Sequence, residues 1–212
     1  MSPSSKPVVA FVLVFCTVAY AQGIEDERAA AERAFAEYVV GVNNGDFALA
    51  KSHAWGQLTD YDCLRAFVEF AKARYDLTGA MFRRLGEKDP TGEPLTAKDV
   101  QEGIAADALI IRGDQATLQY GSDVVRLVRV EGVWKVDLTG ERLTEERRRR
   151  HEALTEMMRG LIRDIESGRI NDWDALEKER TQREAQVWIR LRAAATRPAT
   201  QPRPPRRETP HD

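Results

Sequence analysis

Few side chains in this chain of 212 residues have the type and spacing that catalysis requires. His53 follows an apolar segment, where an imidazole could act as a general base or serve as a helix cap or partly buried structural residue. Asp60, Asp62 and Asp76 each lie next to a tyrosine, and an acid beside a tyrosine in a pocket could polarise a carbonyl. Acids near a helix start also bind free backbone amides. If the protein is an enzyme, these four residues are its catalytic candidates.

Thiol and metal chemistry have little support in the sequence. Cys63 is the only cysteine after residue 21, so the mature chain has no internal disulfide, and we expect the thiol to be buried as a small apolar group. The three histidines, His53, His151 and His211, are dispersed and give no metal-ligand spacing with Cys63. The sequence has no glycine-rich phosphate loop, nucleophile elbow or zinc-binding helix. We therefore expect no metal and no cofactor.

The first 21 residues are typical of a secretory signal peptide. Lys6 supplies a positive charge, Val8–Tyr20 is an uncharged apolar run, and Ala19 and Ala21 are small residues at the two positions that signal peptidase reads. The apolar run is shorter than the roughly 20 residues that span a bilayer. Cleavage before Gln22 is therefore predicted, which gives an exported protein of the periplasm or the extracellular space without a transmembrane segment.

Two alternatives to this cleavage are an uncleaved anchor and a lipoprotein signal at Cys16. The length of the apolar run disfavours the anchor. The bulky side chain of Phe15 disfavours the lipoprotein signal, which has a small residue before its cysteine.

The overall charge and the C-terminal composition limit the classes of partner. The formal net charge is −2 and becomes −3 when Lys6 is removed with the leader. This near balance gives no electrostatic case for binding nucleic acid. Residues 196–212 are rich in proline and arginine and have almost nothing to bury, so we predict a disordered tail.

Apolar periodicity predicts an α+β fold. Helical spacing covers 25–42, 46–52 and 60–85, and the pairs Thr59 with Asp62 and Thr96 with Asp99 resemble helix caps. The stretches with strand character are 108–112, 116–120, 124–130 and 133–138, and the short breaks between them predict an antiparallel meander. Helical spacing returns over 143–167 and 171–195. We expect N-terminal helices packed on a curved four-stranded meander over 22–140, then a long helical hairpin over 143–195.

The last predicted helix carries an apolar cluster made by Val187, Trp188 and Leu191. If the hairpin folds at Gly168, this cluster lies opposite Arg147–His151, which offers no apolar seam. We therefore expect the cluster to pack on the α+β domain or to be an interaction site for another chain, either a second copy or an envelope protein.

The run Arg147–Arg150 follows two acids. It could bind a polyanion, but Glu145 with Arg149 and Glu146 with Arg150 have the favourable spacing of four residues on a helix. A self-paired, solvated helix face is the interpretation that we adopt.

Three stretches of the α+β part resemble those of a known superfamily. They are Tyr38–Phe47, where one helix ends and the next begins, Gly113–Thr117, a turn into a strand, and the hairpin Val128–Val136 with its Gly-Val-Trp-Lys-Val end. Over about residues 25–140 the chain is similar to the nuclear transport factor 2-like superfamily, which includes the SnoaL-like proteins. The resemblance implies a cone-shaped α+β fold with a pocket between sheet and helices. It implies no single function, because the superfamily includes isomerases, dehydratases, carriers and interaction modules.

Two functional hypotheses follow from the sequence. The first is an exported, non-enzymatic protein whose α+β domain binds a small apolar ligand or a protein partner and whose helical hairpin mediates association. The alternative is a small-molecule enzyme of the isomerase, dehydratase or hydrolase type, with His53 or a nearby aspartate as its base. An enzyme requires at least two of the candidate polar groups to converge on one cavity.

Overall fold

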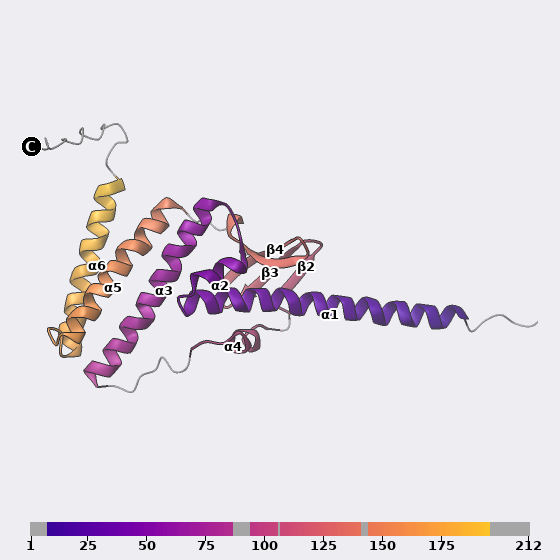
Figure 1. Ribbon diagram of the computed structural model, residues 1–212, viewed down its shortest axis with the longest axis horizontal. Helices are drawn as coiled ribbons and strands as arrows, with labels where there is room; N and C mark the ends of the chain where they lie inside the picture. Colours follow the sequence, from indigo (N-terminus) through magenta and orange to yellow (C-terminus); the bar gives the residue numbers. More distant parts are fainter. Residues whose placement is uncertain (1–7, 87–93, 106, 141–143, 196–212) are drawn as a thin grey trace, which may run out of the picture.

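The computed structural model describes residues 8–86, 94–105, 107–140 and 144–195, and it is an α+β fold (Figure 1). Helices come first, a five-stranded, mostly antiparallel sheet follows, and two helices in contact with each other end the chain. The elements are α1 (Val8–Asn43), α2 (Phe47–Ser52), β1 (Ala54–Trp55), α3 (Leu58–Leu85), α4 (Ala97–Glu102), β2 (Leu109–Arg112), β3 (Gln115–Tyr120), β4 (Asp123–Val130), β5 (Val133–Asp137), a short 3-10 turn (Leu138–Gly140), α5 (Glu145–Glu166) and α6 (Trp173–Ala195).

Helix α1 extends beyond the sheet on the side of the N-terminus (Figure 1). From Glu25 to Ala30 no side chain of α1 is buried, and Ala31 is the first that is. Among the described residues, no helix combines the length and the apolarity that a membrane crossing requires. The expected tail at 196–212 and the first residues of the expected leader lie outside the described residues.

The start of α3 differs from the sequence expectation. Gln57 is the cap residue. Its backbone N–H donates to Asp60 Oδ2 at 2.7 Å, and the Asp60 N–H donates to the Gln57 carbonyl at 3.1 Å. The expected pair, Thr59 with Asp62, was therefore wrong, because the helix begins at Leu58 and both residues already belong to its first turns.

The other two expected helix starts are confirmed. The Asp46 carboxylate accepts a hydrogen bond from the Leu49 N–H at 2.9 Å at the start of α2. At the start of α4, Thr96 and Asp99 form a reciprocal capping box, in which the Thr96 N–H donates to Asp99 Oδ2 at 2.9 Å. These caps fix the points at which the chain enters both short helices.

The sheet has the order β1-β5-β4-β3-β2, and β2 to β5 form the predicted antiparallel meander. Two-residue turns join the strands, and Gly113, Gly121 and Gly132 have positive φ angles of 63°, 59° and 81° there, as tight hairpins of this twist require. Strand β1 was not predicted. It pairs in parallel with β5, Ala54 opposite Val136, and its two residues are too few to show an alternating pattern.

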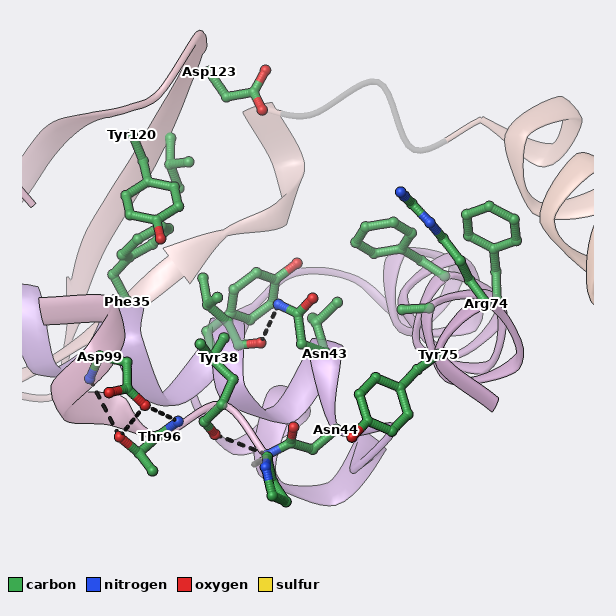
Figure 2. Close-up of a pocket in the computed structure, with 18 of the residues that line it drawn as sticks. Phe35, Tyr38, Asn43, Asn44, Arg74, Tyr75, Thr96, Asp99, Tyr120 and Asp123 are labelled. Atoms are coloured by element: carbon green, nitrogen blue, oxygen red, sulfur yellow. Dashed lines mark hydrogen bonds between the residues drawn. The ribbon is translucent and has the colours of Figure 1, made fainter. Parts of the chain in front are cut away.

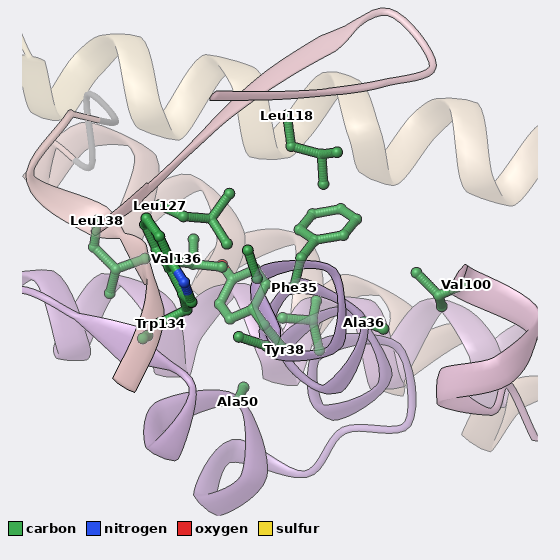
Figure 3. Packing of buried hydrophobic residues seen from close by; sticks show 14 of the residues in the cluster. Phe35, Ala36, Tyr38, Ala50, Val100, Leu118, Leu127, Trp134, Val136 and Leu138 are labelled. Carbon is green, nitrogen blue, oxygen red and sulfur yellow. The ribbon is translucent and has the colours of Figure 1, made fainter. Parts of the chain in front are cut away.

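The first apolar core lies between the sheet and helices α1 to α4 (Figure 3). Trp134 is 3% exposed, which confirms that its strand buries this face, and the Arg129 guanidinium lies 5.3 Å from the ring centroid. Gly41 lets α2 approach α1, because a Cβ atom there would lie 2.4 Å from the Ala50 backbone nitrogen. Phe35 and Tyr38 of α1 lie against the apolar face of the sheet.

The second apolar core joins the C-terminal half of α3 to α5 and α6. Leu77 and Ala80 of α3 pack with buried residues of α5 and α6 there, namely Met157, Leu161, Ile165, Leu176 and Val187. Helix α3 therefore belongs to both cores, since Leu64 and Val68 from its first half are part of the sheet core. The second core therefore takes residues from both sides of the expected boundary near residue 140, and α3 contributes to both cores.

Candidate functional site

A cleft with a volume of about 1180 Å³ opens beside the sheet core. Its walls come from the C-terminal half of α1, the middle of α3, the segment entering α4, the β3–β4 hairpin and the start of α5. Figure 2 shows Tyr120 and Asp99 on one side of it, Arg74 and Tyr75 on the other, and Tyr38 between them. Five elements that are distant in sequence thus form one concave surface.

Aromatic side chains contribute a part of this surface. Six of them line it: Phe35, Tyr38, Phe67, Phe70, Tyr75 and Tyr120. The rings of Phe35 and Tyr120 meet edge to face, with centroids 5.1 Å apart, which holds α1 against β3. Tyr75 is 41% exposed, so one flat face of the wall is open to a ligand. Such a lining offers a large apolar contact area at little cost in side-chain freedom.

Several polar side chains at the cleft form hydrogen bonds with other groups of the chain. Asn43 Nδ2 donates to the Val39 carbonyl at 2.9 Å, and Asn44 Nδ2 donates to the Leu95 carbonyl at 3.1 Å. Asp99 accepts from the Thr96 hydroxyl at 2.6 Å. Hydrogen bonds from the side chain and backbone of Thr96 hold the pKa of Asp99 below its ordinary value. This carboxylate is therefore ionised at neutral pH and is a poor proton donor or acceptor.

Three charged side chains at the cleft have no ion-pair partner among the described residues. Arg74 of α3, Arg147 of α5 and Asp123 of β4 line it, and within the described residues none of them has an oppositely charged side chain within 4.0 Å. The neighbours of Arg147 differ, since Arg148 and Arg149 both bind the carboxylate of Glu145. Among the described residues that line the cleft, these three side chains therefore have charges that the fold does not pair.

His151 lies directly behind the aromatic wall. Its ring stacks on Phe70 with centroids 5.2 Å apart and lies tilted against Phe67 with centroids 5.3 Å apart. Burial lowers the pKa of His151, and the charges of Arg150 and Arg147 lower it further. The imidazole is therefore neutral at neutral pH and acts as an aromatic spacer between α3 and α5.

None of the four sequence candidates for catalysis lines the cleft. His53 is the C-terminal cap of α2, and its carbonyl accepts the Val136 N–H at 2.8 Å. Asp60 is used in the α3 cap, Asp62 is exposed, and Asp76 forms an ion pair with Lys72 at 3.0 Å. The structure does not bring the four together at this site, and their catalytic role stays a prediction.

Cys63 is buried, as expected, and burial raises the pKa of its thiol. The Sγ atom lies 3.8 Å from the Thr144 carbonyl. A thiol that is buried and difficult to ionise fits a structural role at the α3–α5 junction better than a nucleophilic one. Within the described residues, no group of three or more histidine, cysteine, aspartate or glutamate side chains could hold a metal ion.

The expected interaction residues of α6 lie in three environments. Val187 is 7% exposed and belongs to the second core, and Leu191 packs against that core half-buried. Trp188 is 39% exposed, and the Arg150 guanidinium lies 4.5 Å from its ring centroid. The expectation that Arg147–His151 gives this cluster no cover was wrong for Trp188, because a guanidinium covers an indole face without an apolar seam.

The helix predicted over 60–85 has an apolar stripe that the sequence alone does not assign to a cleft. Its members Phe67, Phe70, Ala71 and Tyr75 line the cleft, and its first member, Leu64, is buried. The buried residues of α3 divide between the two cores, with Leu64 and Val68 in the first and Leu77 in the second. Helix α3 therefore has more apolar surface than one core contact requires. No family model, no curated protein and no solved structure matches the chain.

Proposed function

We propose that the chain is an exported, non-enzymatic binding protein whose cleft takes a small apolar ligand. The observation that carries this proposal is the cleft itself, in which six aromatic side chains surround about 1180 Å³. Volumes of this size accept ligands of the dimensions of common metabolites and lipids. The alternative enzyme is disfavoured, because His53, Asp60, Asp62 and Asp76 all lie outside the lining.

The proposed fold is the cone-like one of the nuclear transport factor 2-like superfamily, followed by a helical hairpin. Helices α1, α3 and α4 beside an antiparallel meander, with a cleft between them, are consistent with it. Export rests on the signal-peptide pattern of residues 1–21. The absence of buried side chains between Glu25 and Ala30 is compatible with cleavage before Gln22, because the packed part of α1 would remain intact.

The test is a fluorescence titration with phenylnaphthylamine, a neutral aromatic probe that becomes bright in apolar sites. We expect saturable binding by the wild-type protein. The variant Tyr75→Ser removes an open aromatic wall and should weaken binding by about tenfold, the equivalent of about 1.4 kcal/mol. Leu58→Ser is the matched control, since Leu58 is 79% exposed and does not line the cleft. Absence of saturable binding, or equal affinity in both variants, would contradict the proposal.

A further inference from the structure

The charges of the cleft are divided between its walls. Arg74 lies on α3 and Arg147 on α5, two helices that are in contact where the His151 ring lies against Phe67 and Phe70. The negative charges, Asp99 and Asp123, lie on α4 and β4 across the cleft from Arg74 (Figure 2). A ligand that enters therefore meets a cationic wall and an anionic wall.

The two guanidiniums are unneutralised within the described part of the chain. The other arginines of the same run are engaged: Arg148 and Arg149 bind Glu145, and Arg150 covers the Trp188 ring. Arg147 alone of the four lines the cleft. On α3, the neighbouring cation Lys72 pairs with Asp76, whereas Arg74 lines the cleft without an acidic partner. Arg74 and Arg147 thus differ from the neighbouring cations on their helices, which contact side chains of the same chain.

The aromatic rings lie beside these cations. Phe70 precedes Arg74 by one helical turn, and Phe70 stacks on His151, which follows Arg147 by one turn. A guanidinium beside an apolar surface binds carboxylate or sulfonate oxygens through two parallel hydrogen bonds. Asp99, which its cap holds in the ionised form, disfavours an anionic group at the opposite wall.

From this arrangement we infer that the ligand is a small amphipathic anion, an aromatic or aliphatic acid. Its apolar body lies against the aromatic rings, and its anionic group lies at Arg74 and Arg147. The inference rests on the proposed function, because it specifies the chemistry of a ligand in the same cleft.

The test compares two probes with similar aromatic bodies, anilinonaphthalene sulfonate and neutral phenylnaphthylamine. Both are titrated into the wild-type protein, into Arg74→Gln/Arg147→Gln and into Arg126→Gln/Arg163→Gln. Arg126 and Arg163 are exposed, lie outside the cleft and have no acidic partner among the described residues, so the control removes the same charge. Circular dichroism and thermal unfolding verify that each variant is folded.

We expect Arg74→Gln/Arg147→Gln to weaken sulfonate binding by about tenfold or more, with phenylnaphthylamine affinity changed by less than about twofold. The control should leave the ratio of the two affinities as in the wild type. Added salt should weaken sulfonate binding to the wild type more than to the cleft variant.

The outcomes separate this inference from the proposed function. If phenylnaphthylamine binds but the affinity ratio is the same in all three proteins, the cleft exists as a site and the anion inference is overturned. If both double variants change the ratio equally, a general charge effect explains it and the inference again fails. If neither probe binds the wild type, the proposed function fails as well.

Discussion

The two apolar cores that share α3 differ in whether they contain a buried charge. In the helical core, the Asp164 side chain is 4% exposed and binds both Arg169 and Arg183, so its charge is neutralised inside the chain. In the sheet core no charged side chain is buried among the described residues, and the cleft beside it presents Arg74 and Arg147 without acidic partners. The buried charge of the helical core is thus neutralised within the chain, whereas we propose that the two guanidiniums of the cleft pair with a ligand.

The sheet core should respond most strongly to a large deletion. Trp134→Ala removes a ring that is 3% exposed and leaves a cavity that rigid strands cannot close, which should lower the free energy of unfolding by about 3–5 kcal/mol. Chemical denaturation measures this change. A loss below about 1 kcal/mol would mean that the ring is not packed in the core.

The buried carboxylate of the helical core is the next test. Asp164→Ala removes the carboxylate that Arg169 and Arg183 share and should destabilise the protein by about 2 kcal/mol. The control is Arg180→Gln, which breaks an exposed ion pair with Glu177 and should cost less than about 1 kcal/mol. If the two variants lose the same stability, the buried Asp164 carboxylate contributes no more than an exposed ion pair, and the contrast between the two cores fails on the helical side.

His151 should make stability depend on pH where the two cores meet. Its pKa is lowered below the ordinary value of 6.5 in the folded protein, so the unfolded chain binds the proton more readily. Stability is therefore full above pH 6.5 and falls as the pH decreases through 6.5 towards the lower pKa of the folded state. The variant His151→Phe keeps the stacking on Phe70 and should lose less stability between neutral and mildly acidic pH. Parallel pH profiles of the two proteins would contradict the stacked, neutral imidazole.

The smallest stability effect is expected on α6. Trp188→Ser with Ile189→Ser removes two apolar side chains that are 39% and 67% exposed, and loss of the Arg150–Trp188 contact should cost about 1 kcal/mol. Light scattering then tests the expected association. If the wild type is an oligomer and the variant has a lower mass, α6 forms an interface between copies. If the wild type is a monomer and the variant has the same mass, this surface of α6 packs only within its own chain.

Much of the fold could be predicted because its signals are local. The alternating apolar positions of β3 and β5, and the glycine at each tight turn, identify the meander without tertiary information. Strand β1 could not be predicted, since two residues show no period and Ala54 pairs with a strand about 80 residues further along the chain. The capping pair of α3 was misplaced because Thr59 with Asp62 and Gln57 with Asp60 have the same spacing.

The cleft is harder to predict because it depends on distances between elements. Phe67, Phe70 and Tyr75 have the same helical spacing whether they face a core or an open cleft. Arg74 and Arg147 are far apart in the sequence, and only the packing of α5 on α3 brings both to one surface. His53 was the histidine candidate because it follows an apolar segment, whereas His151, in a charged helix, is the histidine that lies against Phe67 and Phe70 of the cleft.

The most direct test of the cleft is to locate a bound ligand residue by residue. Backbone amide chemical shifts of the labelled protein are recorded during a titration with anilinonaphthalene sulfonate. The largest changes should occur at amides of the cleft walls, such as Val39, Tyr75 and Val124, which belong to three different elements, with residues 173–195 unaffected. Largest changes at Trp188 and Ile189, or no saturable change anywhere, would contradict a ligand-binding cleft beside the sheet.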